Sequence, residues 1–240
     1  MYPRKKKIFI ISELSPQNEG DIDMLKTMIL QSKMGGADAV KLQVYNSINF
    51  LGDSRKEFSE ITKKELVELK VYADSLSISL FGSAFDKERL QWLNDINVEF
   101  HKIPSKIYNR DKLLVKKALD SKKVTFISNG LDCSDFSFGE YDNARYFYCV
   151  TKYPAYVEDV NLPDFYNHPY YVGYSDHTWG LTAAKVAVSR GAKYIEKHFT
   201  LSKGMQSSVN KAHLGSMCLQ ELIELRSFCD DFVRMPIKEG

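Results

Sequence analysis

Short apolar runs alternate with amphipathic segments along most of the chain. Runs of strand character occur eight times, at residues 7–13, 39–44, 79–84, 99–103, 124–129, 144–150, 170–175 and 194–199. Between them, apolar residues at helical spacing predict helices at 23–34, 62–76, 87–95, 109–121, 181–190 and 219–233. Segment 131–143 has a weaker pattern, which we interpret as a short or degenerate helix. Thr62 and Glu65 fit a capping box at the start of their helix.

Strands that alternate with helices indicate a parallel sheet. Eight such units in a chain of 240 residues favour an α/β protein of the (β/α)8 (TIM) barrel class, for which ~250 residues is typical. A doubly wound open sheet uses the same alternation and is the alternative. Because no linker-like or low-complexity stretch divides the chain, we expect residues 1–240 to form one domain.

Polar residues stand where these strands should end, which is the edge at which a barrel carries its chemistry. They are Glu13, Lys41 with Gln43, Lys102 with Ser105, Ser128, and Tyr153 beyond the sixth strand. A lysine in a buried strand is unfavourable without an anionic partner. Two explanations stay open for Lys41 and Lys102: a buried Lys–Glu pair, with Glu13 as one partner, or a bound phosphate or carboxylate.

Two histidines end the last two strands. His177 lies in Tyr-Ser-Asp-His-Thr and His198 in Glu-Lys-His-Phe-Thr, beside Ser175 and Glu196. In a strand–helix–strand unit both imidazoles would reach the same edge of the sheet. Two neutral imidazoles at one cavity suit a divalent transition metal with open positions. The alternative is a pair of hydrogen-bonded structural histidines.

Composition excludes several classes of function. With 44% hydrophobic residues, 27% charged residues and a formal charge of +2, the chain gives no electrostatic case for nucleic acid or an anionic membrane surface. No apolar run approaches the ~20 residues of a membrane span, and no signal-peptide or nucleotide-binding glycine pattern is present. The four cysteines show no paired spacing, so we expect a reduced cytoplasmic protein. Cys149 fits a structural cysteine better than a nucleophile.

Several motifs together resemble the sialic acid synthase family, the phosphoenolpyruvate-condensing synthases of nonulosonic acids. The resemblance spans about residues 8–226, and the motifs occur in the family's order. They are Ile-Ser-Glu-Leu (11–14), Gly-Gly-Ala-Asp-Ala-Val-Lys-Leu-Gln (35–43), Phe-His-Lys-Ile-Pro-Ser (100–105), Phe-Ile-Ser-Asn-Gly (126–130), Tyr-Pro (153–154), Gly-Tyr-Ser-Asp-His-Thr (173–178) and Ile-Glu-Lys-His-Phe-Thr-Leu (195–201).

The resemblance implies a barrel enzyme that joins phosphoenolpyruvate to an open-chain N-acylated amino sugar of the mannosamine type and releases phosphate. It implies a divalent ion, usually manganese, held by His177 and His198. It further implies that Glu13 acts on water or a hydroxyl and that Glu196 orients a ligand or water. The residues expected to contact the substrates are Lys41, Gln43, Lys102, Ser105, Ser128, Tyr153 and Ser175.

The chain departs from the family pattern on the sugar side of the site. Gln17-Asn-Glu-Gly20 replaces Asn-His-Asn-Gly, Thr151 replaces an Asn, and Val209 stands where a sugar-contacting Asp is expected, with His213 and Asn210 as nearby polar candidates. No separate phosphate motif for a sugar-phosphate acceptor is evident. Residues 1–240 do not include the antifreeze-like domain that family members extend across a homodimer. We therefore expect a homodimer or a second chain that supplies this domain; the alternative is a non-catalytic or partner-dependent paralogue that binds metal and phosphoenolpyruvate.

Overall fold

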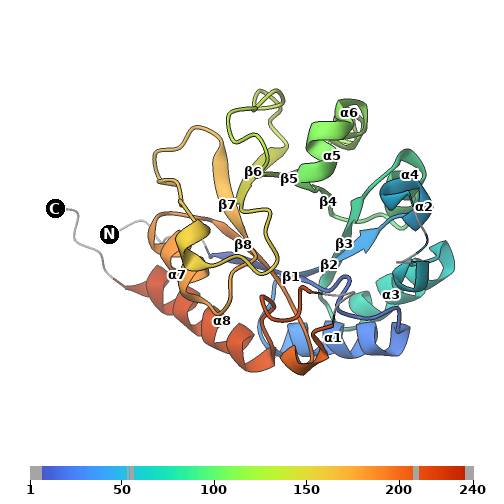
Figure 1. Cartoon of the computed structure of the whole chain (residues 1–240), viewed down its shortest axis with the longest axis horizontal. Coiled ribbons are helices and arrows are strands. Elements are labelled where there is room, and N and C mark those ends of the chain that lie inside the picture. Colours follow the sequence, from blue (N-terminus) through green and yellow to red (C-terminus); the bar gives the residue numbers. More distant parts are fainter. Residues whose placement is uncertain (1–6, 53, 55–56, 208–210, 236–240) are drawn as a thin grey trace.

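Eight parallel strands close into a barrel in the computed structural model, which describes residues 7–52, 54, 57–207 and 211–235 (Figure 1). Each strand pairs with the next along the chain, and β1 pairs with β8. The predicted (β/α)8 barrel is confirmed, and the open doubly wound sheet is wrong. The strands are β1 (Phe9–Glu13), β2 (Ala39–Val44), β3 (Ser79–Ala84), β4 (Phe100–Ile103), β5 (Val124–Asn129), β6 (Ala144–Cys149), β7 (Tyr171–Asp176) and β8 (Tyr194–His198).

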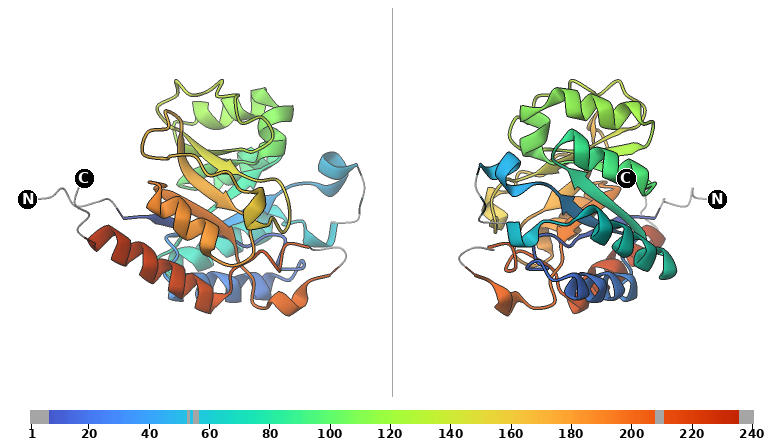
Figure 2. Two further views of the ribbon diagram at one scale, coloured as in Figure 1. Left: turned by 60° about the vertical axis from the view of Figure 1, so that its left-hand side comes forward. Right: turned by 90° about the vertical axis from the view of Figure 1, so that its right-hand side faces the viewer.

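The helices lie outside the strands, as the two views of Figure 2 show. They are α1 (Ile22–Met34), α2 (Ser47–Leu51), α3 (Lys63–Ser75), α4 (Lys87–Asp95), α5 (Ser105–Arg110), α6 (Lys112–Asp120), α7 (Thr182–Ser189) and α8 (Leu219–Arg234). The capping box of Thr62 and Glu65 is confirmed at the start of α3. Within the described ranges, no helix combines the length and apolar character needed to cross a bilayer.

The helix predicted at 109–121 is wrong in its bounds, because two helices, α5 and α6, occupy residues 105–120. Asp111 separates them: its backbone leaves the helical region, and its carboxylate accepts a hydrogen bond from the Leu114 N–H at 2.9 Å. An Asp that caps a helix in this way ends the preceding helix as well. The α5 helix starts at Ser105, with Pro104 between it and Ile103, the last residue of β4.

Segment 131–143 forms no helix, although all its residues are described. Phe136 instead packs its ring against those of Tyr146, Tyr170 and Tyr171, with centroids 4.5 to 5.1 Å apart. These aromatic contacts cover β6 and β7, which have no helix between β5 and β7 to bury their outer face. Large rings bury enough apolar area to replace a helix here.

The barrel interior begins with a layer of aromatic rings. Its members are Phe9, Phe81, Phe100, Phe126, Phe147 and Tyr194, with neighbouring ring centroids 5.1 to 5.9 Å apart. Gly173 completes the layer, because a Cβ there would lie 2.7 Å from the Phe147 ring. Side chains two positions further along a strand point the same way. Each strand therefore places its next inward residue above the rings, toward the carboxyl edge.

Candidate active site

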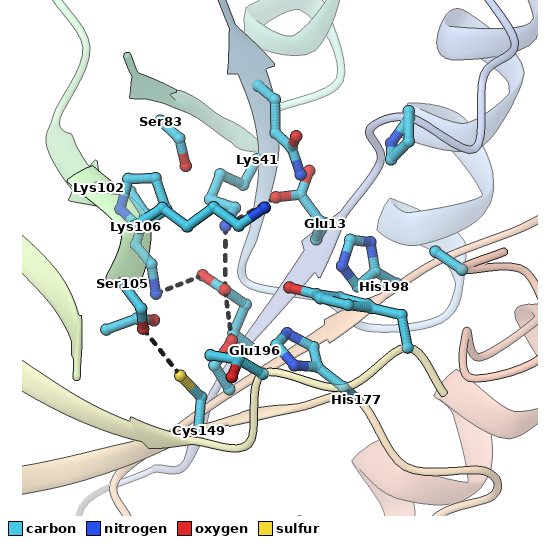
Figure 3. A pocket seen from close by; sticks show the side chains of 18 of the residues that line it. Glu13, Lys41, Ser83, Lys102, Ser105, Lys106, Cys149, His177, Glu196 and His198 are labelled. Carbon is cyan, nitrogen blue, oxygen red and sulfur yellow. Dashed lines mark hydrogen bonds and ion pairs between the residues drawn. The ribbon is translucent and has the colours of Figure 1, made fainter. Parts of the chain in front are cut away.

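A cavity of about 440 Å³ opens at the carboxyl ends of the strands (Figure 3). All eleven residues that the sequence nominated for the site line it. Seven of them lie two or four positions beyond a residue of the interior layer, which explains their common direction. The eleven are Glu13, Lys41, Gln43, Lys102, Ser105, Ser128, Tyr153, Ser175, His177, Glu196 and His198.

Four charged side chains form a buried row on the floor of this cavity. Lys41 Nζ lies 2.7 Å from Glu13 Oε2 and 3.0 Å from Glu196 Oε1, and Lys102 Nζ lies 3.1 Å from Glu196 Oε2. Lys102 Nζ also lies 4.5 Å from the centre of the Phe147 ring below it. The Lys–Glu pairing that the sequence left open is present, and both lysines nevertheless face an open cavity.

The two carboxylates of this floor differ in pKa. Burial raises the pKa of Glu13 and outweighs the opposing effect of Lys41, while the charge of Glu196 raises it further. Burial also raises the pKa of Glu196, but Lys102 and Lys41 together outweigh it, so the net pKa lies below its usual range. Burial lowers the pKa of Lys102 to about 8. Glu13 is therefore suited to carry a proton and Glu196 to remain ionised.

The two histidines lie side by side at the cavity, with ring centroids 5.7 Å apart. His177 donates Nδ1–H to the Val150 carbonyl at 2.6 Å, and His198 Nδ1 lies 2.9 Å from Gln17 Oε1. Burial lowers the pKa of His177 to about 4 and holds that of His198 well below its usual value. Both rings are therefore neutral, with the proton on Nδ1 and a lone pair on Nε2.

This arrangement fits a divalent metal, because metal-bound histidines use one nitrogen as a ligand and donate from the other to an oxygen. Within the part of the chain that the structure describes, no group of three or more His, Cys, Asp or Glu has metal-site geometry. An ion held by His177 and His198 would thus take its remaining ligands from water or substrate.

A second buried ion pair fixes the turn that carries His177. Lys197 and Asp176 lie 2.9 Å apart, and Lys197 also donates to the Thr178 carbonyl at 2.6 Å. Asp176 accepts hydrogen bonds from the N–H and the hydroxyl of Thr178. These contacts hold residues 176–178 on both sides of His177 and so restrict its position.

Hydroxyl groups surround the charged floor. Ser175 donates to Glu196 Oε1 at 2.8 Å, and the Ser105 hydroxyl lies 3.1 Å from the Cys149 sulfur. Burial raises the pKa of Cys149, so it stays a thiol at neutral pH and is a poor nucleophile. Gln43 is held by its amide, which donates to the Ser15 carbonyl at 3.2 Å.

The segments that depart from the family pattern contact one another. Gln17 bonds His198, and Glu19 Oε1 lies 3.0 Å from His213 Nε2, whose other nitrogen lies 2.8 Å from the Thr200 hydroxyl. His213 is fully buried in these contacts and does not line the cavity, so it is wrong as a sugar-contacting candidate. Thr151 does line the cavity. Val209 and Asn210 lie outside the described residues.

The sequence reasoning missed one side of the cavity. Ser83, Phe85, Lys106 and Phe50 line it there, from β3, the residue after β3, α5 and α2. Strand parity could have identified Ser83, which is two residues beyond Phe81 of the interior layer. Lys106 gave no such signal, because the predicted helix began at 109 and left its direction undefined.

The family model for the NeuB family matches residues 28–231. The chain belongs to the NeuB family. The resemblance to sialic acid synthases that the motifs indicated is thereby confirmed. The match includes every strand from β2 to β8, and so most of the residues that line the cavity.

Relatives of this NeuB-family chain include proteins named as synthases. A pseudaminic acid synthase of Campylobacter jejuni is 32% identical over 87% of the chain and 70% of its own length. An uncharacterized protein of Methanocaldococcus jannaschii is 35% identical over 82% of this chain. This chain spans 64% of the length of that protein, which is less than two thirds. The crystal structure of a sialic acid synthetase from Leptospira borgpetersenii, in complex with citrate, superposes with a TM-score of 0.86 at 28% identity, covering 95% of this chain and 85% of that chain.

Proposed function

We propose that the chain condenses phosphoenolpyruvate with an open-chain N-acylated amino sugar to give a nonulosonic acid and phosphate. The observation that carries this proposal is the combination of two groups in one cavity. A neutral histidine pair and a row of lysines and glutamates face the same space. The histidine pair suits a metal that activates a carbonyl, and the charged row suits a small, highly charged anion.

Lys41, Lys102 and the hydroxyls of Ser105, Ser128 and Ser175 would hold the phosphate and carboxylate of phosphoenolpyruvate. Each lysine has three N–H donors, and Lys102 contacts a single carboxylate oxygen, so donors remain for a ligand. Such preorganised donors stabilise the charge that develops on the leaving phosphate. Tyr153 and Gln43 would contact the substrates from the sides of the cavity.

In the reaction, the methylene carbon of phosphoenolpyruvate forms a bond to the aldehyde carbon of the sugar. Water then adds to the enolpyruvyl carbon, and the bond from this carbon to the phosphate oxygen breaks. One proton of the water ends on the former aldehyde oxygen and the other on phosphate. Glu13 accepts the proton as water attacks, because its raised pKa suits proton transfer near neutral pH. Glu196 stays ionised and orients Lys41 and Lys102.

We propose Mn²⁺ as the divalent ion, held by His177 and His198. When bound, it would polarise the aldehyde oxygen as a Lewis acid. The chain's own part is to present two neutral nitrogens, which Val150 and Gln17 fix in one orientation.

The test measures phosphate release from phosphoenolpyruvate with Mn²⁺ and N-acylated amino sugars, together with thermal unfolding. Phosphoenolpyruvate should raise the melting temperature of the native chain, since it binds only the folded state. Lys41→Met and Lys102→Met should greatly reduce the shift, whereas Lys63→Met, which removes a surface partner of Asp95, should retain it. A thermal shift without phosphate release from any sugar would favour the non-catalytic or partner-dependent alternative; no shift at all would refute phosphoenolpyruvate binding.

A further inference from the structure

The connection from β8 to α8 contacts the backbone of both histidines of the proposed metal site. Its last part, residues 212–217, which we call the crossing segment, is buried at every position except Leu214. Most connections run over the surface, because water then satisfies their backbone polar groups. A connection as buried as this one must find partners within the protein.

The crossing segment is bonded to the backbone directly after the His198 ring. The Met217 N–H donates to the His198 carbonyl at 2.7 Å, and the Thr200 N–H donates to the Met217 carbonyl at 2.9 Å. These two hydrogen bonds lie on either side of Phe199, which pairs with Met217 as an isolated parallel bridge. The crossing segment therefore fixes the backbone at the end of β8.

Gly215 brings the same segment against the backbone of His177. A Cβ at Gly215 would lie 2.8 Å from the His177 carbonyl oxygen and 3.4 Å from the Cβ of Pro154. The first distance is shorter than van der Waals contact, so only glycine allows this close approach. The same carbonyl accepts a hydrogen bond from the Ala155 N–H at 2.9 Å. One short segment thus contacts the backbone of both histidines.

His213 joins the crossing segment to the loop that orients the His198 ring. It is fully buried, with Nε2 3.0 Å from Glu19 Oε1 and Nδ1 2.8 Å from the Thr200 hydroxyl. A carboxylate only accepts hydrogen bonds, so Nε2 carries a hydrogen and donates it to Glu19. Glu19 lies two residues after Gln17, whose Oε1 is 2.9 Å from His198 Nδ1.

Two internal hydrogen bonds make the crossing segment a compact turn. The Ser216 hydroxyl donates to the Ala212 carbonyl at 2.7 Å, and the Ser216 N–H donates to the His213 carbonyl at 3.1 Å. The positions of His213, Gly215 and Met217 are therefore linked, so a displacement at one of them is passed to the others.

We propose that the crossing segment sets the separation and orientation of the His177 and His198 rings, with His213 and Gly215 as positioning residues. Ala212 is the one member of the segment that lines the cavity, so His213 and Gly215 act through the backbone and through Gln17. The inference rests on the proposed function for its metal site.

A site with two protein ligands depends strongly on their spacing. Among the residues that the structure describes, no third His, Cys, Asp or Glu completes a metal-binding group with the two histidines. No further protein ligand can therefore compensate when one ring of the pair in Figure 3 is displaced.

The first experiment compares Gly215→Ala with Gly204→Ala, a glycine of the same connection. Calorimetry on the full chain measures Mn²⁺ affinity, and the visible absorption of bound Co²⁺ reports ligand geometry. Gly215→Ala should reduce Mn²⁺ affinity roughly tenfold and shift the Co²⁺ bands, because its Cβ displaces the His177 backbone. Gly204→Ala should retain both properties, since its Cβ would contact only Ser202 Oγ, at 3.3 Å.

The second experiment removes the contact between His213 and Glu19. His213→Leu fills the buried volume without either hydrogen bond, and it should also lower Mn²⁺ affinity and shift the Co²⁺ bands. Glu19→Ala should act in the same direction, and it tests the contact from a partly exposed side chain if His213→Leu does not fold. Glu19→Gln keeps an acceptor oxygen and should retain native values.

Urea unfolding of the metal-free variants separates positioning from stability. Variants at His213 and Gly215 that lose stability but keep native Mn²⁺ affinity and the native Co²⁺ spectrum would overturn the proposal, because the segment would then support the fold alone. An equal loss of affinity in Gly204→Ala would overturn it as well.

None of these measurements uses phosphoenolpyruvate or a sugar, so failure of the proposed reaction is distinguishable. If no sugar released phosphate while the His213 and Gly215 variants still altered metal binding, the reaction would be refuted and the positioning role would stand. If the native chain bound neither Mn²⁺ nor Co²⁺, the metal site and the positioning role would both be refuted.

Discussion

The floor of the cavity and the wall formed by Phe50, Ser83, Phe85 and Lys106 carry their charges in opposite ways. On the floor, Lys41 and Lys102 are buried, and each has a carboxylate partner before any ligand arrives: Glu13 and Glu196 for Lys41, and Glu196 for Lys102. On the wall, Lys106 is exposed and has no carboxylate partner in the described part of the chain. The floor comes from strands and the wall largely from α2, α5 and the end of β3.

This difference implies that the floor and the wall contribute differently to folding. A buried ion must be paired for the chain to fold, so the ion pairs of the floor form whether or not substrate is present. An exposed cation needs no partner for folding, because water already solvates it. We therefore expect substitutions on the floor to alter stability and metal or anion binding together, and substitution of Lys106 on the wall to leave stability unchanged.

The largest expected effect is that of Glu196→Gln on stability. It leaves Lys102 without a carboxylate partner in a buried position, and breaking such a pair costs about 3–5 kcal/mol of unfolding free energy. Urea unfolding at pH 7 measures it. Glu68→Gln, which removes a surface partner of Lys26, is the matched control and should change stability little. Equal effects of the two changes would show that the buried ion pair on the floor contributes no more to stability than the surface pair does.

The next effect concerns the metal. His177→Ala and His198→Ala should each reduce Mn²⁺ affinity by more than the roughly 10–100-fold that loss of an outer partner of a metal ligand costs. The fold should survive, because both rings lie at strand ends above the packed interior layer. Calorimetry measures the affinity and circular dichroism the fold. His168→Ala, outside the cavity, is the control. Unchanged Mn²⁺ affinity in both single variants would refute the assignment of His177 and His198 as metal ligands.

A smaller effect is expected for Gln17, which orients His198. Gln17→Leu should weaken Mn²⁺ binding roughly tenfold, because the ring loses the acceptor that fixes its proton on Nδ1. Gln17→Glu keeps an acceptor and should retain affinity. The neighbouring Asn18→Leu is a matched control, since Asn18 is buried and its amide has no partner among the described residues. If Asn18→Leu reduced Mn²⁺ affinity as much as Gln17→Leu, the effect would come from the loop as a whole and not from the contact of Gln17 with His198.

The same contrast explains what the sequence could predict. Strand alternation fixes the direction of Lys41, Lys102 and Glu196, because successive residues of a strand point to opposite faces. No comparable rule fixes Lys106, whose direction depends on where α5 starts, and the break at Asp111 that sets α5 apart from α6 is a matter of local capping. The contact of Glu19 with His213 joins residues far apart in sequence, so no local pattern indicates it.

The last effect, which is absent near pH 7, is a pH dependence of phosphoenolpyruvate binding that reports on Lys102. Burial lowers the pKa of Lys102 to about 8 in the free protein, and only the protonated amine attracts the anion. The phosphate of the ligand is already dianionic above pH 7, since its second pKa is about 6. Affinity should therefore be constant near pH 7 and fall as pH rises through 8, by about tenfold at pH 9.

Lys41 supplies the internal comparison for this pH dependence. Burial lowers its pKa, but Glu13 and Glu196 outweigh that effect, so the net pKa lies above its usual value and Lys41 stays charged throughout. Calorimetry from pH 6.5 to about 9.5 on three proteins would separate the two lysines. Lys41→Met should bind weakly at every pH yet keep the fall near pH 8, whereas Lys102→Met should lose it. A fall near pH 8 that persisted in Lys102→Met would assign the titration to another group and would mean that the Lys102 ammonium does not contact the anion.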